Sequence, residues 1–242
     1  PQCHILWKVV YATQPEHSIN REVQGLRLIP AALRWFFLRE GPLTTGSAPV
    51  GAFCHTRDGL EAPDVQIHFA SGGTLYNNAG KIRALKQPAV TAVVNQSRPE
   101  SRGSIHAKSS DIADAPVIAA NYLSSALDRD TLLRGMRILL NIFDQSELQP
   151  YLNGRLSPDI ETDLNDDEAL MAYIRREAST VYHPTSTCSI GKVVDENLRV
   201  LAIEGLSVID ASVMPYVVSG NTNAATIMLA EKGADHLLAA RR

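Results

Sequence analysis

The order of strand-like segments and turns in the first half of the chain most constrains its fold. In one segment, Val65, Ile67 and Phe69 alternate with Gln66 and His68, which is the pattern of a half-buried strand. Similar runs recur along the chain with turns between them, at residues 5–11, 50–56, 65–70, 88–95 and 103–107. This order predicts an antiparallel sheet rather than repeated strand–helix–strand units. Residues 71–87 are expected to form a long surface loop.

Three helices are expected to cover this sheet. They span residues 21–38, 128–143 and 166–176. Asn20 would cap the first, Pro30 would kink it, and Asp128 would cap the second. The second has apolar residues on one face, Leu132, Met136, Leu139 and Phe143. The fold class predicted is therefore α+β, an antiparallel sheet flanked by helices.

Composition excludes several classes of function. The chain has 242 residues, a net charge of −3 and a pI near 6.2, so nothing favours nucleic acid or an anionic membrane as partner. No apolar run approaches the roughly 18–20 residues of a membrane span, and no signal peptide is evident. The three cysteines lack metal-type spacing, and the neighbours Cys54 and His55 point to opposite faces of a strand, so no metal site is expected. We expect a cytoplasmic protein.

The last quarter of the chain holds the best candidates for chemistry. His183 lies in a polar turn, and a second polar turn, residues 219–223, precedes an expected helix from about residue 224 to 238. Residues 206–210 between them are expected to form a short buried strand. An imidazole can exchange a proton near neutral pH, and a helix amino end attracts an anionic or electron-rich ligand.

The motifs around these residues resemble the carboxyl-terminal part of the glucose-methanol-choline (GMC) oxidoreductases, in the choline and alcohol dehydrogenase branch. The similar segments are Tyr182-His183-Pro184-Thr185-Ser186-Thr187-Cys188, Val193-Val194-Asp195-Glu196-Asn197, Val208-Ile209-Asp210-Ala211-Ser212 and Ser219-Gly220-Asn221-Thr222-Asn223-Ala224-Ala225-Thr226. Upstream, Arg39-Glu40-Gly41-Pro42, Pro63-Asp64-Val65-Gln66 and Arg98-Pro99-Glu100-Ser101-Arg102-Gly103 resemble the substrate domain of the family in the same order. The resemblance covers nearly the whole chain.

This resemblance implies FAD-dependent oxidation of a primary alcohol, choline-like or aliphatic or aromatic, to an aldehyde. A base takes the hydroxyl proton while a hydride passes to flavin N5. The position of the catalytic base is His183, and that of the orienting partner is Asn223. The cofactor-binding positions are Asp210 and Ala211, which match contacts to the FAD chain, and Ala224 and Ala225, which match contacts to the flavin edge.

The resemblance also implies a division into domains. Residues 1–180 would form the substrate-binding domain, and residues 181–242 would carry the catalytic residues and complete the FAD domain. The family's Gly-x-Gly-x-x-Gly turn has no counterpart, since Gly72-Gly73 is only a glycine pair. The link at residues 191–193 is shorter than the loop that members of the family usually have at this place. We therefore expect a fragment or cleaved piece that needs an amino-terminal FAD-binding region in cis or in trans.

Without that region, we expect an exposed apolar face that favours association with another chain, including a homo-oligomer. Its residues would include Val208, Ile209, Ile227 and Leu229.

Plainer interpretations stay open beside these. His183 before a proline can be a hydrogen-bonded turn residue, Asn221 to Asn223 can be a helix cap, and Asp210 can close a turn. The whole chain can be a truncated, non-catalytic module that binds a ligand or a partner chain without FAD. A hydrolase is disfavoured because the chain has no Gly-x-Ser-x-Gly turn.

Overall fold

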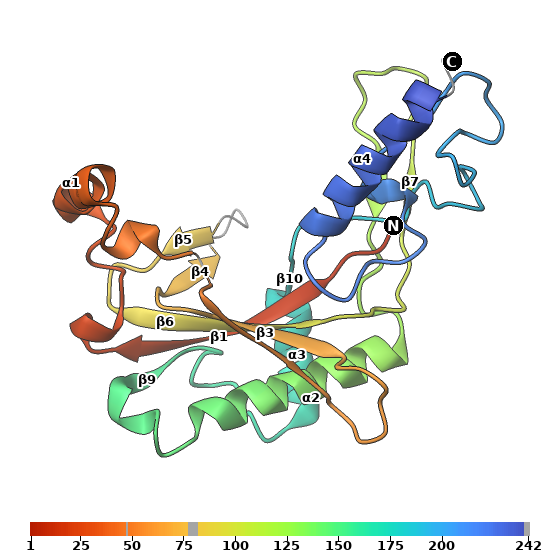
Figure 1. Cartoon of the computed structure of the whole chain (residues 1–242). Helices are drawn as coiled ribbons and strands as arrows, with labels where there is room; N and C mark the ends of the chain where they lie inside the picture. The colour runs from red at the N-terminus through yellow and green to blue at the C-terminus, as the bar shows by residue number, and fades with distance from the viewer. Residues whose placement is uncertain (47, 77–81, 240–242) are drawn as a thin grey trace. The chain divides into compact units, whose positions relative to one another are not determined.

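The chain forms two compact units, seen here in a computed structural model that describes residues 1–46, 48–76 and 82–239 (Figure 1). Unit 1 consists of Pro1–Ile5, Gln96–Thr131 and Ser179–Arg242. Unit 2 consists of Leu6–Asn95 and Leu132–Ala178. These units divide the chain differently from the expected cut at residue 180, because residues 96–131 fold with the carboxyl-terminal segment. The assignment of functions to residues 1–180 and 181–242 stays a prediction.

The sheet of unit 2 confirms the predicted α+β class. Strands β1 (Ile5–Thr13), β6 (Ala89–Gln96), β3 (Val65–Ala70) and β2 (Val50–Cys54) lie in that order, and β9 (Leu152–Ser157) also pairs with β1. The pairs β1–β6, β1–β9 and β2–β3 are antiparallel. The expected loop at 71–87 was wrong in part, because β4 (Thr74–Tyr76) and β5 (Ile82–Ala84) pair there; residues 77–81 lie outside the described part.

Helix α2 (Ala126–Phe143) packs directly on the sheet, and its predicted apolar face is buried. The contact is close because Gly135 faces the strands: a Cβ added there would lie 3.0 Å from side-chain carbons of Val65 in β3 and Val94 in β6. The phenyl ring of Phe143 stacks on Tyr11 of β1 with centroids 4.6 Å apart. The helical period of the sequence thus identified the core of unit 2.

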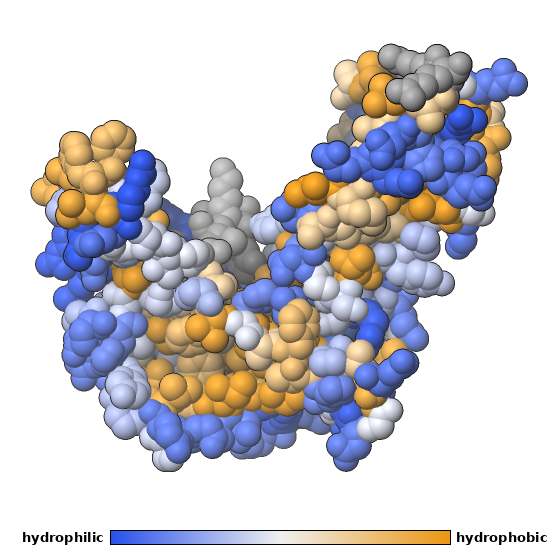
Figure 2. Space-filling model, viewed as in Figure 1, coloured by the Kyte–Doolittle hydropathy of each residue, from blue (hydrophilic) through white to orange (hydrophobic). Residues whose placement is uncertain are grey.

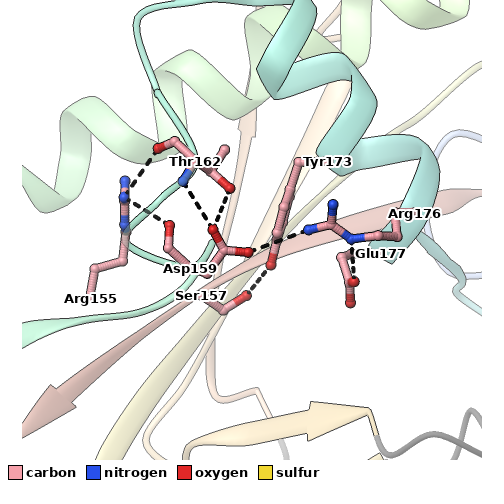
Figure 3. A network of polar contacts seen from close by, with 7 residues as sticks. All are labelled: Arg155, Ser157, Asp159, Thr162, Tyr173, Arg176 and Glu177. Carbon is pink, nitrogen blue, oxygen red and sulfur yellow. Dashed lines mark hydrogen bonds and ion pairs between the residues drawn. The ribbon is translucent and has the colours of Figure 1, made fainter.

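Helix α3 (Asp167–Glu177) agrees with the helix expected over residues 166–176, and Asp166 caps it by accepting a hydrogen bond from the Glu168 amide. The hydroxyl of Tyr173 lies 2.8 Å from Ser157 Oγ at the end of β9 (Figure 3). Figure 3 also shows Arg176 reaching Asp159, whose carboxylate accepts from the hydroxyl and the amide of Thr162. These contacts tie α3 to the segment that follows β9.

The first expected helix is shorter than predicted and does not cover the sheet. Helix α1 (Leu28–Leu38) follows a 3-10 turn, so Pro30 lies in the first helical turn, where its missing N–H costs nothing. Asn20 is buried away from α1: it accepts from the Gly73 amide and donates to the carbonyls of Gly73 and Leu85. Figure 2 shows apolar residues gathered over α1, and the exposed ones include Ile29, Leu33, Phe36, Phe37 and Leu38.

Unit 1 contains short strands and one long helix. Its elements are β7 (Ser104–His106), β8 (Val117–Ala119), β10 (Ser179–Thr180) and α4 (Asn223–Ala239). Strand β7 pairs with β8 in a hairpin. The predicted strand at 206–210 was wrong: only an isolated bridge between Arg199 and Ser207 forms there. The predicted cap role of Asp128 was also wrong, because its buried carboxylate accepts from Gln96 and from the amides of Glu100 and Ser101.

The carboxyl-terminal segment buries part of its own apolar face. Val194, Leu198 and Val213 form a cluster against which Val208, Ile209 and Leu229 pack. Of the four residues expected to be exposed without a flavin domain, only Ile227 is largely so, at 54%. Val208, Ile209 and Leu229 are only partly exposed because they pack on this cluster, whereas Met228 and Leu238 are exposed beside Ile227. Among the described residues, no helix is long and apolar enough to cross a membrane.

Truncating Leu139 to alanine should destabilise the protein by about 2–5 kcal/mol, because the side chain is 1% exposed and its removal leaves a cavity. Ile142→Ala on the same helix is the control, since that side chain is 37% exposed and should cost about 1 kcal/mol or less. Urea unfolding measures both. Equal costs for the two variants would contradict the burial described for α2.

Gly233→Ala should destabilise by about 1–3 kcal/mol, because an added Cβ clashes with the Cγ2 methyl of Ile209. In an Ile209→Ala background the clash is absent, and the same substitution should become neutral or stabilise by up to about 1 kcal/mol through helix propensity. Urea unfolding of the two single variants and the double variant measures this coupling. Additive effects would show that α4 does not pack on Ile209.

Candidate active site

His183 is held between two backbone attachments in unit 1. The Val181 amide donates to the carbonyl of His4 at 3.1 Å. Beyond His183, Thr185 and Gln2 exchange backbone hydrogen bonds at 2.9 and 3.0 Å. Pro184 disfavours a helical conformation at His183, and Tyr182 before it is in the left-handed region with φ 61°. The hydrogen bonds make residues 181–185 run antiparallel to residues 2–4, with His183 beside His4.

The two imidazoles form a buried pair. Their Nδ1 atoms are 2.9 Å apart, and the rings meet edge to face with centroids separated by 5.1 Å. The exposed fractions are 0% for His4 and 9% for His183. The other nitrogen of His4, Nε2, lies 3.0 Å from the carbonyl oxygen of Ser97. The candidate base is thus part of a hydrogen-bonded chain.

Burial lowers the pKa of His4 from 6.5 to about 4. The carbonyl of Ser97 opposes this shift in pKa, the positive charge of His183 adds to it, and the carbonyl of Val218 again opposes it. Desolvation is the largest of these effects. His4 is therefore a neutral imidazole at neutral pH.

The side chain of Gln2, near His4 in the sequence, joins the amino-terminal segment of unit 1 to the segments that contain Pro99 and Val217. Its Nε2 donates to the carbonyl of Pro99 at 2.6 Å, and its Oε1 accepts from the Val217 amide at 3.0 Å. A cavity of about 740 Å³ lies against the same residues. Its lining includes Gln2, Arg98, Arg102, Tyr216, Val217 and Val218, with the Arg102 guanidinium over the Tyr216 ring.

The segment after His183 is fastened to the turn that contains Asp210 and Ala211. The amides of Cys188 and Ile190 donate to the carbonyls of Ser212 and Val213, each at 2.9 Å. Asp210 caps this turn, because its Oδ1 accepts from the Ser212 amide at 2.7 Å. The Asp210 side chain is nevertheless exposed.

Asn223 is the first residue of α4. Thr222 occupies the N-cap position, since its carbonyl accepts the first helical bond, from the Thr226 amide at 2.9 Å. Asn223 and Ala224 are exposed and Ala225 is partly exposed. The positive end of a seventeen-residue helix is thus bordered by small side chains, which suits an electron-rich ligand edge.

All six predicted site residues lie in unit 1, although they come from three separate stretches of sequence. His183 is buried, whereas Asn223, Ala224 and Asp210 are exposed. The sequence did not single out His4, which contacts His183, nor Gln2 and Ser97, which hold the segments beside it. The signal for them was weak: they are polar residues next to the ends of apolar strands, and their partners are about a hundred or more residues away in the chain. In the described part of the chain, no group of three or more His, Cys, Asp or Glu residues could hold a metal ion.

A sequence model of the GMC oxidoreductases matches residues 99–230, which is more than half of the chain. The chain belongs to the GMC oxidoreductase family. The match includes every predicted site residue and the turn at residues 99–103, so the resemblance of the motifs is confirmed at the level of the family.

Curated relatives extend this similarity over nearly the whole chain. An oxygen-dependent choline dehydrogenase from Pseudomonas aeruginosa (strain LESB58) is 35% identical over 240 residues, which are 98% of this chain and 42% of that protein. The enzyme of the same name from Xanthomonas euvesicatoria pv. vesicatoria (strain 85-10) is 36% identical with the same coverage. The chain therefore spans about two fifths of the length of these GMC relatives.

Solved structures show the same fold at lower identity. A variant of the formate oxidase of Aspergillus oryzae matches 98% of this chain and 46% of its own with a TM-score of 0.85 and 20% identity. A fungal aryl-alcohol oxidase matches 98% of this chain and 47% of its own, with a TM-score of 0.74 and 21% identity. The α+β architecture is thus that of GMC proteins.

The buried His4 should make the protein sensitive to acid. Between pH 6.5 and about 4, the unfolded chain binds a proton at this residue that the folded chain does not, so stability falls as the pH falls through this window. The loss attributable to His4 between pH 7 and pH 4.5 should be on the order of 2 kcal/mol. Urea unfolding at pH 7 and pH 4.5 measures it.

The control for this prediction is the exposed His106, also in unit 1. His4→Asn should reduce the dependence of the unfolding free energy on pH by the part that His4 contributes, and His106→Asn should leave it as in the parent chain. If His4→Asn retained the full dependence, titration of His4 would contribute nothing to it.

Proposed function

We propose that this chain supplies the base and the orienting amide for FAD-dependent oxidation of a primary alcohol to an aldehyde. It would act as the carboxyl-terminal part of a GMC alcohol dehydrogenase or oxidase. The observation that carries the proposal is the setting of His183: buried, attached on both sides through the backbone and hydrogen-bonded to a second imidazole.

His183 is suited to the role of base. Histidine is the side chain whose ordinary pKa lies nearest neutral pH, so it can take and return a proton under working conditions. The two backbone attachments limit the movement of the ring, which keeps the acceptor nitrogen aligned with the hydroxyl group. Asn223 cannot take a proton but can donate a hydrogen bond from its amide. We assign it the role of holding the alcohol oxygen as negative charge develops there.

The residues at the start of α4 and at the Asp210 turn fit an FAD molecule. When bound, FAD accepts the hydride that leaves the carbinol carbon. Asp210 and Ala211 would contact the FAD chain, with the Asp210 side chain exposed on a capped turn. Ala224 and Ala225 would let the flavin edge approach the backbone N–H groups, and the positive helix end would favour negative charge there.

The partner of this chain would be the amino-terminal FAD-binding region, joined in cis or supplied in trans. The relatives support this, since the chain spans 42% of the P. aeruginosa choline dehydrogenase. That name also favours a choline-like alcohol as the substrate class, while other small aliphatic or aromatic alcohols are tested beside it. The exposed apolar residues of α4, such as Ile227 and Met228, are available for contact with such a region or with a second copy.

The test is reconstitution of a flavoprotein. The chain is expressed fused to, or together with, the part of the P. aeruginosa enzyme that it does not match, and the product is purified with added FAD. We expect visible flavin absorption that is bleached anaerobically by a primary alcohol. A protein that stays colourless in both arrangements would contradict the proposal and favour the non-catalytic binding module.

In the reconstituted protein, His183→Ala should lower the rate of flavin bleaching by about 100- to 10,000-fold, because general base catalysis is lost. Asn223→Ala should cost about 10- to 100-fold, since the oxygen loses one oriented donor. His106→Ala, an exposed histidine of the same unit, should leave the rate unchanged. Anaerobic stopped-flow absorption measures all three, and near-parental bleaching by His183→Ala would disprove the assignment of the base.

A further inference from the structure

We infer that His4 is a positioning residue for His183: a hydrogen-bond relay from Ser97 through His4 determines which nitrogen of His183 carries the proton. The catalytic meaning of this relay rests on the proposed function, whereas the relay itself is a property of this chain. All three residues lie in unit 1.

The direction of the relay follows from the partner of His4 Nε2. That nitrogen lies 3.0 Å from the carbonyl oxygen of Ser97. A carbonyl oxygen can only accept a hydrogen bond, so Nε2 of His4 must carry the hydrogen. A ring in the opposite tautomer would place a lone pair against the oxygen lone pairs.

The tautomer of His4 then sets that of His183. A neutral imidazole carries a hydrogen on only one of its two ring nitrogens. His4 with its hydrogen on Nε2 therefore has a lone pair on Nδ1. This Nδ1 lies 2.9 Å from Nδ1 of His183. The only arrangement that makes a hydrogen bond is donation from His183 Nδ1 to His4 Nδ1. Neutral His183 therefore has its proton on Nδ1 and its lone pair on Nε2.

Burial keeps the relay in this direction. The pKa of His4 is lowered to about 4, so the ring is neutral at working pH. A charged His4 would donate from both nitrogens and would force His183 to accept at Nδ1, with its proton on Nε2. The carbonyl of Val218 also lies near the His4 ring and favours the charged form, but desolvation outweighs it. Neutral His4 is thus required for the stated tautomer.

The relay assigns the base atom. When the alcohol hydroxyl gives up its proton, the O–H bond breaks, its electron pair stays on oxygen, and a new N–H bond forms at Nε2 of His183. The resulting imidazolium keeps its Nδ1–H hydrogen bond to His4, which accepts throughout and gains no proton. A lone pair on His4 thus stabilises the charge on His183 and holds the ring in place, as the partner of a catalytic histidine commonly does.

The direct test is the tautomeric state of the histidines in the 242-residue chain. Long-range proton–nitrogen NMR of histidine labelled with nitrogen-15 distinguishes Nδ1–H from Nε2–H rings. At pH 7.5 we expect His183 as the Nδ1–H form and His4 as the Nε2–H form, and His4 should begin to titrate only as the pH approaches 4. Signals are assigned with His4→Asn and His183→Asn. Detection of His183 as the Nε2–H form, or of His4 as the Nδ1–H form, would overturn the inference.

Two substitutions at His4 separate positioning from a structural role. Asparagine places an amide oxygen near the position of Nδ1, so His4→Asn should keep the tautomer of His183. His4→Leu fills similar space with no acceptor, and the Nε2–H form of His183 should appear. In the reconstituted protein, His4→Leu should lower kcat by about 10- to 100-fold with little change in KM, and His4→Asn should restore most of the loss. Equal loss in both variants, with His183 unchanged by NMR, would contradict a positioning role.

The two proposals can fail separately. The NMR measurement needs no flavin, so the expected tautomers in a protein that never oxidises alcohols would support the relay and reject the proposed function. Alcohol oxidation that depends on His183, combined with a His183 that carries its proton on Nε2, would support the function and reject the relay.

Discussion

The antiparallel contact between the first residues of the chain and residues 181–185 is the interaction on which the site depends. Backbone hydrogen bonds from Val181 to His4 and between Thr185 and Gln2 join segments about 180 residues apart in the chain. This contact brings the two imidazoles within hydrogen-bond distance and lets Gln2 reach Pro99 and Val217. Disrupting it would leave His183 in a loop with no reason to adopt one orientation.

Two buried polar side chains help to define the packing of this part of unit 1. Gln2 and His4 are almost fully buried, and both polar atoms of each side chain make hydrogen bonds. A buried polar group without a partner costs free energy, so alternative packings of these residues are disfavoured. The same low dielectric holds His4 neutral, and only a neutral neighbour can accept a hydrogen bond from His183. In the proposed function, folding stability and proton transfer would therefore depend on the same few hydrogen bonds.

Each unit has its own apolar packing, and the exposed candidate ligand-binding residues lie in unit 1. In unit 2, α2 packs its periodic apolar face on β3 and β6, whereas α1 leaves apolar side chains exposed (Figure 2). In unit 1, the Val194, Leu198 and Val213 cluster supports the turn and the helix that present Asp210 and Asn223 outward. Rigid support beneath exposed polar groups is the arrangement expected where a ligand is to be held.

Local patterns in the sequence were enough to predict the strands β1, β3 and β6, the apolar face of α2, the extent of α3 and the start of α4 near Asn223. Each depends on neighbours within a few residues, since periodicity and capping are local effects. The motifs likewise identified the family and singled out His183 as the candidate base. The start of α1, the β4–β5 hairpin and the true role of Asp128 could not be predicted, because they depend on partners distant in sequence. The same holds for the His4–His183 pair: the two residues are 179 positions apart in a chain of 242, so only folding could bring them together.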